Sequence, residues 1–205
     1  MHHHHGGSCD CANEGKEPGD LVSLYSSVDI DRVCALNEVQ SGSGKLVIKP
    51  YEQRLDEVTT IRSICDGELL FIVPFVVSVG LKAITVRGIA GACPTNLKIW
   101  ANRQDIDFNN ASYDKPTQEL YVPHDPSGTL KLFLHQQHFT AISSLTLLLS
   151  QPQQADSEIE INYIGFFGKP HAVRRQVVDV VYESQANPMD HPVKESFTPN
   201  NLTVQ

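Results

Sequence analysis

Apolar and polar residues alternate with a period of two along most of the chain after residue 45. Successive side chains of a β-strand point to opposite faces, so this period predicts half-buried strands. The residues predicted to share one face within a strand are Leu97, Ile99 and Ala101; Leu130, Leu132 and Leu134; Leu145, Leu147 and Leu149; and Ile159, Ile161 and Tyr163.

Further strands are predicted at residues 45–49, 69–73, 79–89 and 176–182. Turn residues separate the predicted strands, as in the sequence DPSG at residues 125–128. No helical segments lie between them, which excludes a parallel sheet with helical crossovers. About eight short strands with tight connections predict an all-β fold, an antiparallel β-sandwich or jelly roll.

One short N-terminal helix is predicted at residues 28–36. Asp29 can cap its first turn, Ile30, Val33 and Cys34 fall on one face, and Asn37 can end it. The Gly- and Ser-rich residues 41–44 that follow are expected to form a flexible connection. Residues 1–20 and 192–205 show no apolar period, and we expect the first of these segments to be a disordered tail and the second an exposed extension.

Composition and charge narrow the possible partners. The formal net charge is -8 and no basic run interrupts the acidic surplus, so we do not expect nucleic acid to bind. The longest apolar run, residues 69–77, is too short to cross a bilayer and contains Pro74, so we expect no membrane contact. The N-terminus lacks an apolar signal segment, and we expect the five cysteines to be reduced.

Polar residues at 183–191 raise the question of a metal or catalytic site. Asp190 and His191 are adjacent, so on an extended chain they point to opposite sides and cannot readily share an ion. Asn187 precedes a proline, which favours a turn whose polar side chains bond to backbone amides. A turn at the end of a strand is the preferred interpretation, and a site formed by Glu183, Asp190 and His191 is the alternative.

The arginine pair Arg174 and Arg175 precedes the last predicted strand. The two guanidinium groups can dock an acidic partner surface through bidentate contacts with carboxylates. An internal ion pair or a solvated hairpin is the competing interpretation.

Metal binding has one weak candidate in the N-terminal segment, where imidazole and thiolate groups could gather Zn²⁺; the residues are His2, His3, His4, His5, Cys9 and Cys11. A purification tag and a native segment without metal are the alternatives. The pair His135 and His138 has no further ligand at a suitable offset, and residues 105–116 lack the glycine and glutamate of a calcium loop. No cofactor and no catalytic residue are predicted.

Several blocks, taken in order, resemble the PITH domain family, whose name abbreviates proteasome-interacting thioredoxin domain. They are KPYEQR at residues 49–54, ELLFIVPF at residues 68–75 and YESQANPMDH at residues 182–191. The resemblance implies a β-sandwich of the galactose-binding-like, jelly-roll type. Relatives that carry a thioredoxin domain have a Trp-Cys-Gly-Pro-Cys motif, which this sequence lacks, so it resembles a stand-alone PITH domain over residues 21–191.

The resemblance implies a non-enzymatic protein-binding module that associates with proteasome subunits, through the regulatory particle, in the cytoplasm and nucleus. The partner-binding residues expected from the turn and the arginine pair are Arg174, Arg175, Asn187, Asp190 and His191. A small-ligand or carbohydrate-binding sandwich is the alternative, suggested by the fold alone. Its candidate aromatic residues are Trp100, Tyr113 and Tyr121.

Overall fold

The computed structural model describes residues 21–64, 66–152 and 158–171. The chain divides into two units, Met1–Val173 and Arg174–Gln205, and every described residue belongs to the first. Within the described part, no helix has the length and apolar character needed to span a membrane.

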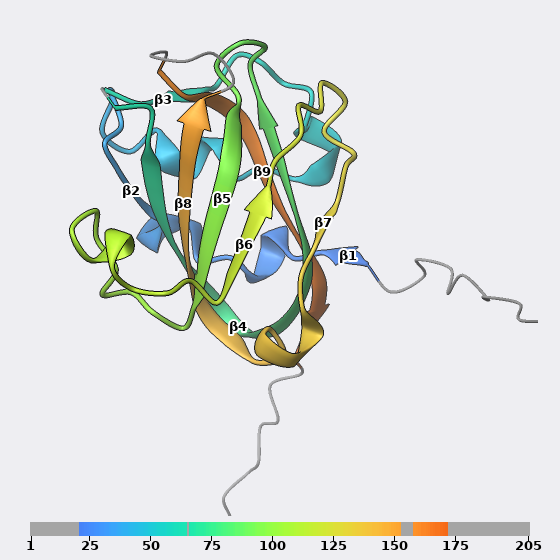
Figure 1. Ribbon diagram of the computed structural model, residues 1–205. Helices are drawn as coiled ribbons and strands as arrows, with labels where there is room; N and C mark the ends of the chain where they lie inside the picture. The colour runs from blue at the N-terminus through green and yellow to red at the C-terminus, as the bar shows by residue number, and fades with distance from the viewer. Residues whose placement is uncertain (1–20, 65, 153–157, 172–205) are drawn as a thin grey trace, which may run out of the picture. The chain divides into compact units, whose positions relative to one another are not determined.

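Strands and short 3₁₀ helices make up the described fold (Figure 1). The strands are β1 (Val22–Ser23), β2 (Cys34–Leu36), β3 (Ile61–Arg62), β4 (Leu69–Gly88), β5 (Pro94–Ala101), β6 (Gln118–Tyr121), β7 (Leu132–Phe133), β8 (Ile142–Pro152) and β9 (Glu160–Pro170). The 3₁₀ helices are η1 (Tyr25–Ser27), η2 (Ile30–Arg32), η3 (Gly44–Val47), η4 (Tyr51–Gln53), η5 (Asn110–Ser112) and η6 (Gln136–His138).

Strand β4 belongs to both layers of a β-sandwich. Its first part pairs with β2 and β8, and β8 continues through β5 to β6. Its second part pairs with β7 and β9, and β9 carries β1 and β3. The register shifts between Pro74 and Val79, where one layer gives way to the other. All pairs between these strands are antiparallel, which confirms the all-β antiparallel sandwich.

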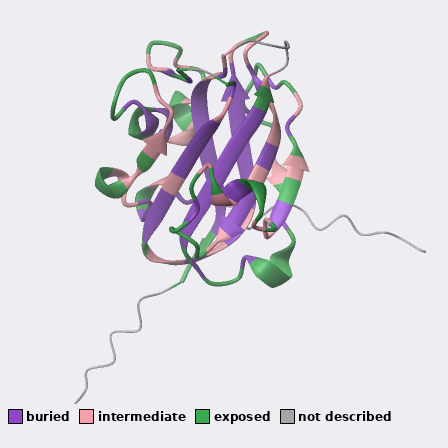
Figure 2. Cartoon of the chain, turned by 60° about the vertical axis from the view of Figure 1, so that its left-hand side comes forward, coloured by how far each residue is buried: buried purple, intermediate pink, exposed green. Residues whose placement is uncertain are grey.

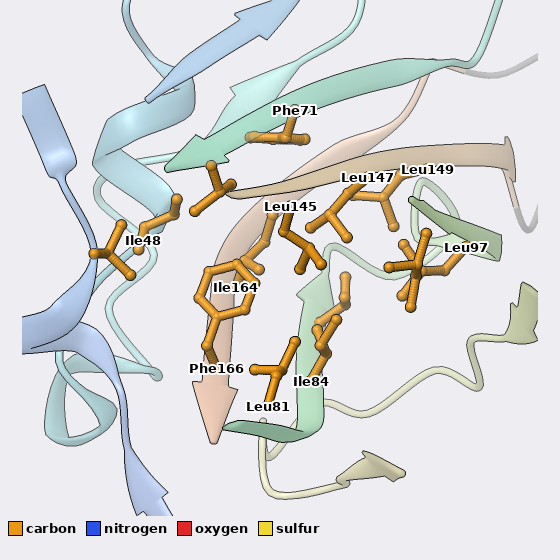
Figure 3. Packing of buried hydrophobic residues seen from close by; sticks show 14 of the residues in the cluster. Ile48, Phe71, Leu81, Ile84, Leu97, Leu145, Leu147, Leu149, Ile164 and Phe166 are labelled. Atoms are coloured by element: carbon orange, nitrogen blue, oxygen red, sulfur yellow. The ribbon is translucent and has the colours of Figure 1, made fainter. Parts of the chain in front are cut away.

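The main core lies between the two layers (Figure 3). In the first layer, rows of apolar residues across the strands face inward. In one such row, Leu147 of β8 lies directly opposite Phe71 of β4 on one side and Ile99 of β5 on the other. Ile84 and Phe166 form an opposite pair in the second layer and belong to the same core cluster. Buried residues run along these strands, whereas the loops are mostly exposed (Figure 2). The alternation in the sequence therefore places the core correctly at residues 97–101 and 145–149.

Several strand predictions need correction. Residues 45–49 do not form a strand, because residues 44–47 turn as the 3₁₀ helix η3. The predicted strands at 69–73 and 79–89 are one strand, β4. Tyr163 does not share the core face of Ile161. Arg87 pairs with Tyr163 and Gly88 pairs with Ile161, so β9 has one extra residue at this point, and the side chain of Tyr163 points to the outer face. Between residues 130 and 134 only Leu132 and Phe133 form a strand.

The predicted N-terminal helix is wrong. Helical geometry covers only three residues, Ile30–Arg32, and Asp29 makes no side-chain cap, although its carboxylate lies 3.7 Å from Arg32. Residues 34–36 pair with β4 as β2. A helix of nine residues is marginal on its own, and backbone pairing with an adjacent long strand prevails here.

The predicted flexible connection at residues 41–44 has fixed internal hydrogen bonds instead. The Glu38 carboxylate accepts bonds from the backbone N–H of Gly42 at 2.5 Å, the backbone N–H of Gly44 at 2.7 Å and the Ser43 hydroxyl at 3.0 Å. Successive donors that converge on an anion form a small concave nest, and here the anion is a side chain of the same chain.

Candidate partner-binding face

The second layer of the sandwich has an outer face, opposite to the core. The register of β4, β7 and β9 places a row of residues there: Ala83, Thr85 and Arg87 of β4, Tyr163, Gly165 and Phe167 of β9, and Phe133 of β7. Ala83 lies directly opposite both Phe133 and Phe167, so these three residues form one cross-strand row. This outer face positions the side chains of the candidate site.

The 3₁₀ helix η4 covers part of this face. The Tyr51 ring packs edge-on against Phe167, with ring centroids 5.6 Å apart and planes at 83°. Tyr163 lies flat over Gly165, since a Cβ atom at that glycine would come within 2.2 Å of the tyrosine hydroxyl. The absence of a side chain at residue 165 therefore allows the large Tyr163 ring to lie beneath the outer surface.

Two cations lie on these aromatic rings. The Arg54 guanidinium lies 4.3 Å from the centroid of Tyr51, and the Lys131 ammonium lies 4.7 Å from the centroid of Phe167 and 5.7 Å from that of Tyr51. All three distances are typical of cation–π attraction. Arg54 also donates from Nε to the Ser127 carbonyl and from Nη1 to the Tyr51 carbonyl, each at 3.2 Å. Within the described residues, neither cation has a carboxylate in ion-pair distance.

We call the surface formed by Tyr51, Arg54, Lys131, Phe133 and Phe167 the cation–aromatic face. Beneath it, Arg87 is buried and donates from Nη2 to Glu57 at 2.6 Å and from Nε to the Pro126 carbonyl at 2.7 Å. Burial raises the pKa of Tyr163 above its ordinary value, with a further contribution from Tyr51. Tyr163 is therefore a neutral phenol in the support of this face at physiological pH.

A shallow groove of about 590 Å³ adjoins this face. Its lining residues are Leu21, His124, Asp125, Thr129, Leu130, Lys131 and Phe133. Phe133 is 64% exposed and Leu130 is 43% exposed, so the groove offers apolar surface to a partner. We call it the β7 groove.

The Asp125 carboxylate in the β7 groove is used by its own loop. It accepts hydrogen bonds from the Ser127 hydroxyl at 2.6 Å, the Ser127 backbone N–H at 3.0 Å and the Leu130 backbone N–H at 2.6 Å. Burial alone would raise the pKa of Asp125, but these hydrogen bonds outweigh burial and lower it. Asp125 is therefore an ionised side chain in the wall of the groove, and its carboxylate oxygens already accept hydrogen bonds from Ser127 and Leu130.

The three aromatic residues proposed for a carbohydrate site do not form one platform. Trp100 is only 1% exposed, because residues 102–116 cover it and it packs with Ile106 and Ala111. Tyr113 and Tyr121 are 89% and 72% exposed. Stacking on a sugar needs an accessible ring face, which Trp100 does not offer.

All the partner-binding residues predicted from the sequence, Arg174, Arg175, Asn187, Asp190 and His191, lie outside the described residues. The same holds for Glu183 and for the metal candidates His2, His3, His4, His5, Cys9 and Cys11. These predictions stay untested. In the described part of the chain, no group of three or more His, Cys, Asp or Glu side chains is placed to hold a metal ion.

The sequence reasoning missed the cation–aromatic face. Its members come from η4 and the residue after it, the loop before β7, β7 itself and β9, so no local pattern unites them. Lys131 and Phe133 alternate with leucines, which indicates outward-facing residues but does not indicate what covers them.

Comparison with known families supplies the identity that the geometry alone does not. The sequence matches the family model of the PITH domain over residues 14–186. The chain belongs to the PITH domain family. The human PITH domain-containing protein 1 is 34% identical over 200 residues, which cover 95% of this chain and 94% of the human protein. The Danio rerio PITH domain-containing protein 1 is 36% identical over 194 residues, covering 94% of this chain and 91% of that protein.

Solved structures agree with the PITH domain fold found here. The CBM32-1, CBM32-2 and M60 catalytic domains of Clostridium perfringens ZmpB match with a TM-score of 0.53 and 11% identity, over 74% of this chain and 15% of that chain. The CBM32-1 and CBM32-2 domains of ZmpB in complex with GalNAc match with a TM-score of 0.50 and 9% identity, over 74% of this chain and 36% of that chain. Likeness at such low identity shows the fold alone, a galactose-binding-like β-sandwich.

Proposed function

We propose that this PITH domain protein is a non-enzymatic protein-binding module that associates with the proteasome, through its regulatory particle, in the cytoplasm and nucleus. Family membership supports the proposal, together with one observation on the molecular surface. The exposed Phe133 lies in the same cross-strand row as Phe167. Lys131 lies over the ring of Phe167, and Arg54 lies over the ring of Tyr51. Aromatic residues and arginine are the side chains most enriched at the energetic centres of protein interfaces.

The architecture supports binding with little rearrangement. The outer face rests on paired strands, and each cation is already placed by a ring or a carbonyl group. Side chains that are ordered before association lose less conformational entropy when a partner arrives. Arg174, Arg175, Asn187, Asp190 and His191 stay proposed as further contacts with the partner, on the sequence reasoning given above.

A carbohydrate-binding function has weaker support. The structural neighbours share only the fold, and ligand specificity depends on the residues of the site. Of the three aromatic candidates, Trp100 is enclosed by residues 102–116. A glycan array probed with the full chain tests this alternative, and saturable binding to one glycan class would favour it.

Affinity purification from cell lysate tests the proteasome proposal. The tagged full chain is expected to recover subunits of the proteasome regulatory particle at low salt, identified by mass spectrometry. A tagged protein of similar charge serves as the control for non-specific capture. Recovery of proteasome subunits at the level of this control would contradict the proposal.

A further inference from the structure

We propose that the cation–aromatic face and the β7 groove together bind an acidic segment of a partner protein that also carries an apolar side chain. The carboxylates of the segment contact Arg54 and Lys131, and the apolar side chain packs on Phe133 and Leu130. This inference rests on the proposed protein-binding function and names the chemistry of the partner.

The charge arrangement on this face favours carboxylates. Described cations elsewhere, such as Arg62 and Arg103, pair with carboxylates of the chain at 2.5 Å and 2.7 Å. Arg54 and Lys131 lie on aromatic rings instead, and Arg54 also donates to two carbonyl oxygens. Next to apolar surface the effective dielectric is lower than in water, so the Coulomb attraction between such a cation and an incoming carboxylate is stronger than for a cation extended into water.

Arg54 retains donors for a ligand. Its Nε and Nη1 atoms donate to the carbonyl groups of Ser127 and Tyr51, which fix the plane of the guanidinium. In the described part of the chain, no hydrogen bond is present from its Nη2 atom. A fixed guanidinium with free N–H groups suits a carboxylate oxygen, because its donors already point in set directions.

The neighbouring carboxylates of the chain are mostly engaged. Asp125 accepts hydrogen bonds from Ser127 and Leu130, and Glu57 pairs with the buried Arg87 at 2.6 Å. Glu52 of η4 is exposed, and within the described residues no ion pair is present for it. An acidic partner therefore meets cations that are not already neutralised by Asp125 or Glu57.

The apolar part of the partner follows from the groove. Phe133 and Leu130 are large side chains that stay 64% and 43% exposed on its wall. Covering the exposed part of these two side chains removes apolar surface from water and so stabilises a complex. A purely acidic segment would leave this apolar area exposed, so the preferred ligand combines both features.

Fluorescence anisotropy with the full chain tests the inference. The probe is a fluorescein-labelled peptide of sequence EDELFDED, and the comparison peptides are NQNLFNQN, which removes the charge, and EDESSDED, which removes the apolar pair. We expect saturable binding of the first peptide, weakened by added salt, and much weaker binding of the other two. Equal binding of the three peptides, or no binding of the first, would overturn the inference.

Matched variants locate the binding site. Lys131→Glu is expected to weaken binding by about fivefold or more, since it replaces attraction with repulsion. Phe133→Ser is expected to weaken binding by about tenfold through lost apolar contact. The control Lys115→Glu changes the net charge equally on an exposed loop residue outside this face and should leave binding unchanged. Equal effects of Lys131→Glu and Lys115→Glu would show that only net charge matters and would overturn the inference.

Two other occupants of the face would give different results in two further measurements. Sedimentation velocity that shows a dimer dissociated by Phe133→Ser would assign the face to a second copy of the chain. Hydrogen exchange that shows protection of residues 1–20, lost in Lys131→Glu, would assign it to the chain's own N-terminal segment. Either result would overturn the inference.

The inference and the proposed function can fail separately. Recovery of proteasome subunits that is unaffected by Lys131→Glu, together with no peptide binding, would reject the inference and keep the proteasome proposal. Specific peptide binding without recovery of proteasome subunits would reject the proteasome proposal and keep the acidic-segment site.

Discussion

The two layers of the sandwich each have an outer face, and the chain covers these two faces to different extents. On the first layer, Trp100 packs with Leu70, Leu148, Ile106 and Ala111 under the loop at residues 102–116. We call this the Trp100 face. On the second layer, the cation–aromatic face is covered only partly, by η4, and Phe133 stays exposed.

The treatment of cations shows the same difference. Arg103, at the start of the loop over Trp100, contacts Asp105 at 2.7 Å and Asp114 at 2.8 Å. These hydrogen bonds raise the pKa of Arg103 and lower that of Asp105. Arg54 and Lys131 have aromatic partners instead. The chain itself therefore covers the Trp100 face and pairs its cation. On the cation–aromatic face, Phe133 stays exposed and the cations have no ion pair among the described residues.

The Trp100 face should give the largest effect on stability. Trp100→Ala removes a fully buried indole and leaves a cavity, so we expect a loss of about 3–5 kcal/mol in the free energy of unfolding, measured by urea denaturation. Tyr121→Ala removes an aromatic ring that is 72% exposed and serves as the control, with an expected change within about 0.5 kcal/mol. A loss for Trp100→Ala as small as the change expected for the control would contradict a structural role for Trp100.

A substitution beneath the cation–aromatic face should give the second-largest loss in the free energy of unfolding. Gly165→Ala places a Cβ atom 2.2 Å from the Tyr163 hydroxyl, so the ring must move, and we expect a loss of about 1–3 kcal/mol in urea denaturation. At Gly80 the nearest atom to a Cβ would be the Thr140 carbonyl oxygen at 3.4 Å, so Gly80→Ala should cost less. A reversed order would contradict the packing of Tyr163 over Gly165.

The wall of the β7 groove should show a dependence on pH. Asp125→Asn weakens the hydrogen bonds that the carboxylate accepts, and we expect a loss of about 1 kcal/mol at pH 7. Because folding lowers the pKa of Asp125, its contribution is present above the ordinary pKa and declines as the pH falls below about 4. Urea denaturation of both proteins between pH 7 and pH 3 should therefore show a narrowing difference, and a difference independent of pH would contradict this role.

Lys131, a half-buried cation, should matter least for stability. Lys131 makes cation–π contacts and no ion pair among the described residues, so Lys131→Glu is expected to change the free energy of unfolding by less than about 0.5 kcal/mol. Thermal and urea denaturation measure this change. A large loss would indicate that Lys131 supports the fold and would weaken the contrast with the Trp100 face.

Much of the fold is predictable because strands repeat every two residues. The leucines at 145, 147 and 149 and the apolar residues at 97 and 99 face the core as their alternation indicates. The failures occur where tertiary contacts override local preference. Residues 34–36 pair with β4 instead of continuing a helix, and one register shift turns Tyr163 away from the core.

The candidate site was harder to predict. Tyr51, Lys131 and Phe167 are far apart in sequence. They meet because β7 and β9 both pair with β4 and Tyr51 of η4 packs on Phe167 of β9. The blocks that resembled the PITH domain did include Tyr51 and Arg54, and the family match over residues 14–186 confirms that resemblance. The roles of Arg174, Arg175, Asn187, Asp190 and His191 stay predictions.

Photo-crosslinking from an exposed aromatic position on each layer tests the central claim most directly. Benzoylphenylalanine is introduced at residue 133 on the cation–aromatic face or at residue 121 on β6, where the native side chains are 64% and 72% exposed. The account predicts a crosslink from residue 133, and not from residue 121, to an acidic segment of a proteasome subunit, identified by mass spectrometry. Crosslinks to the same subunit from residue 121 alone, or equally from both positions, would contradict it.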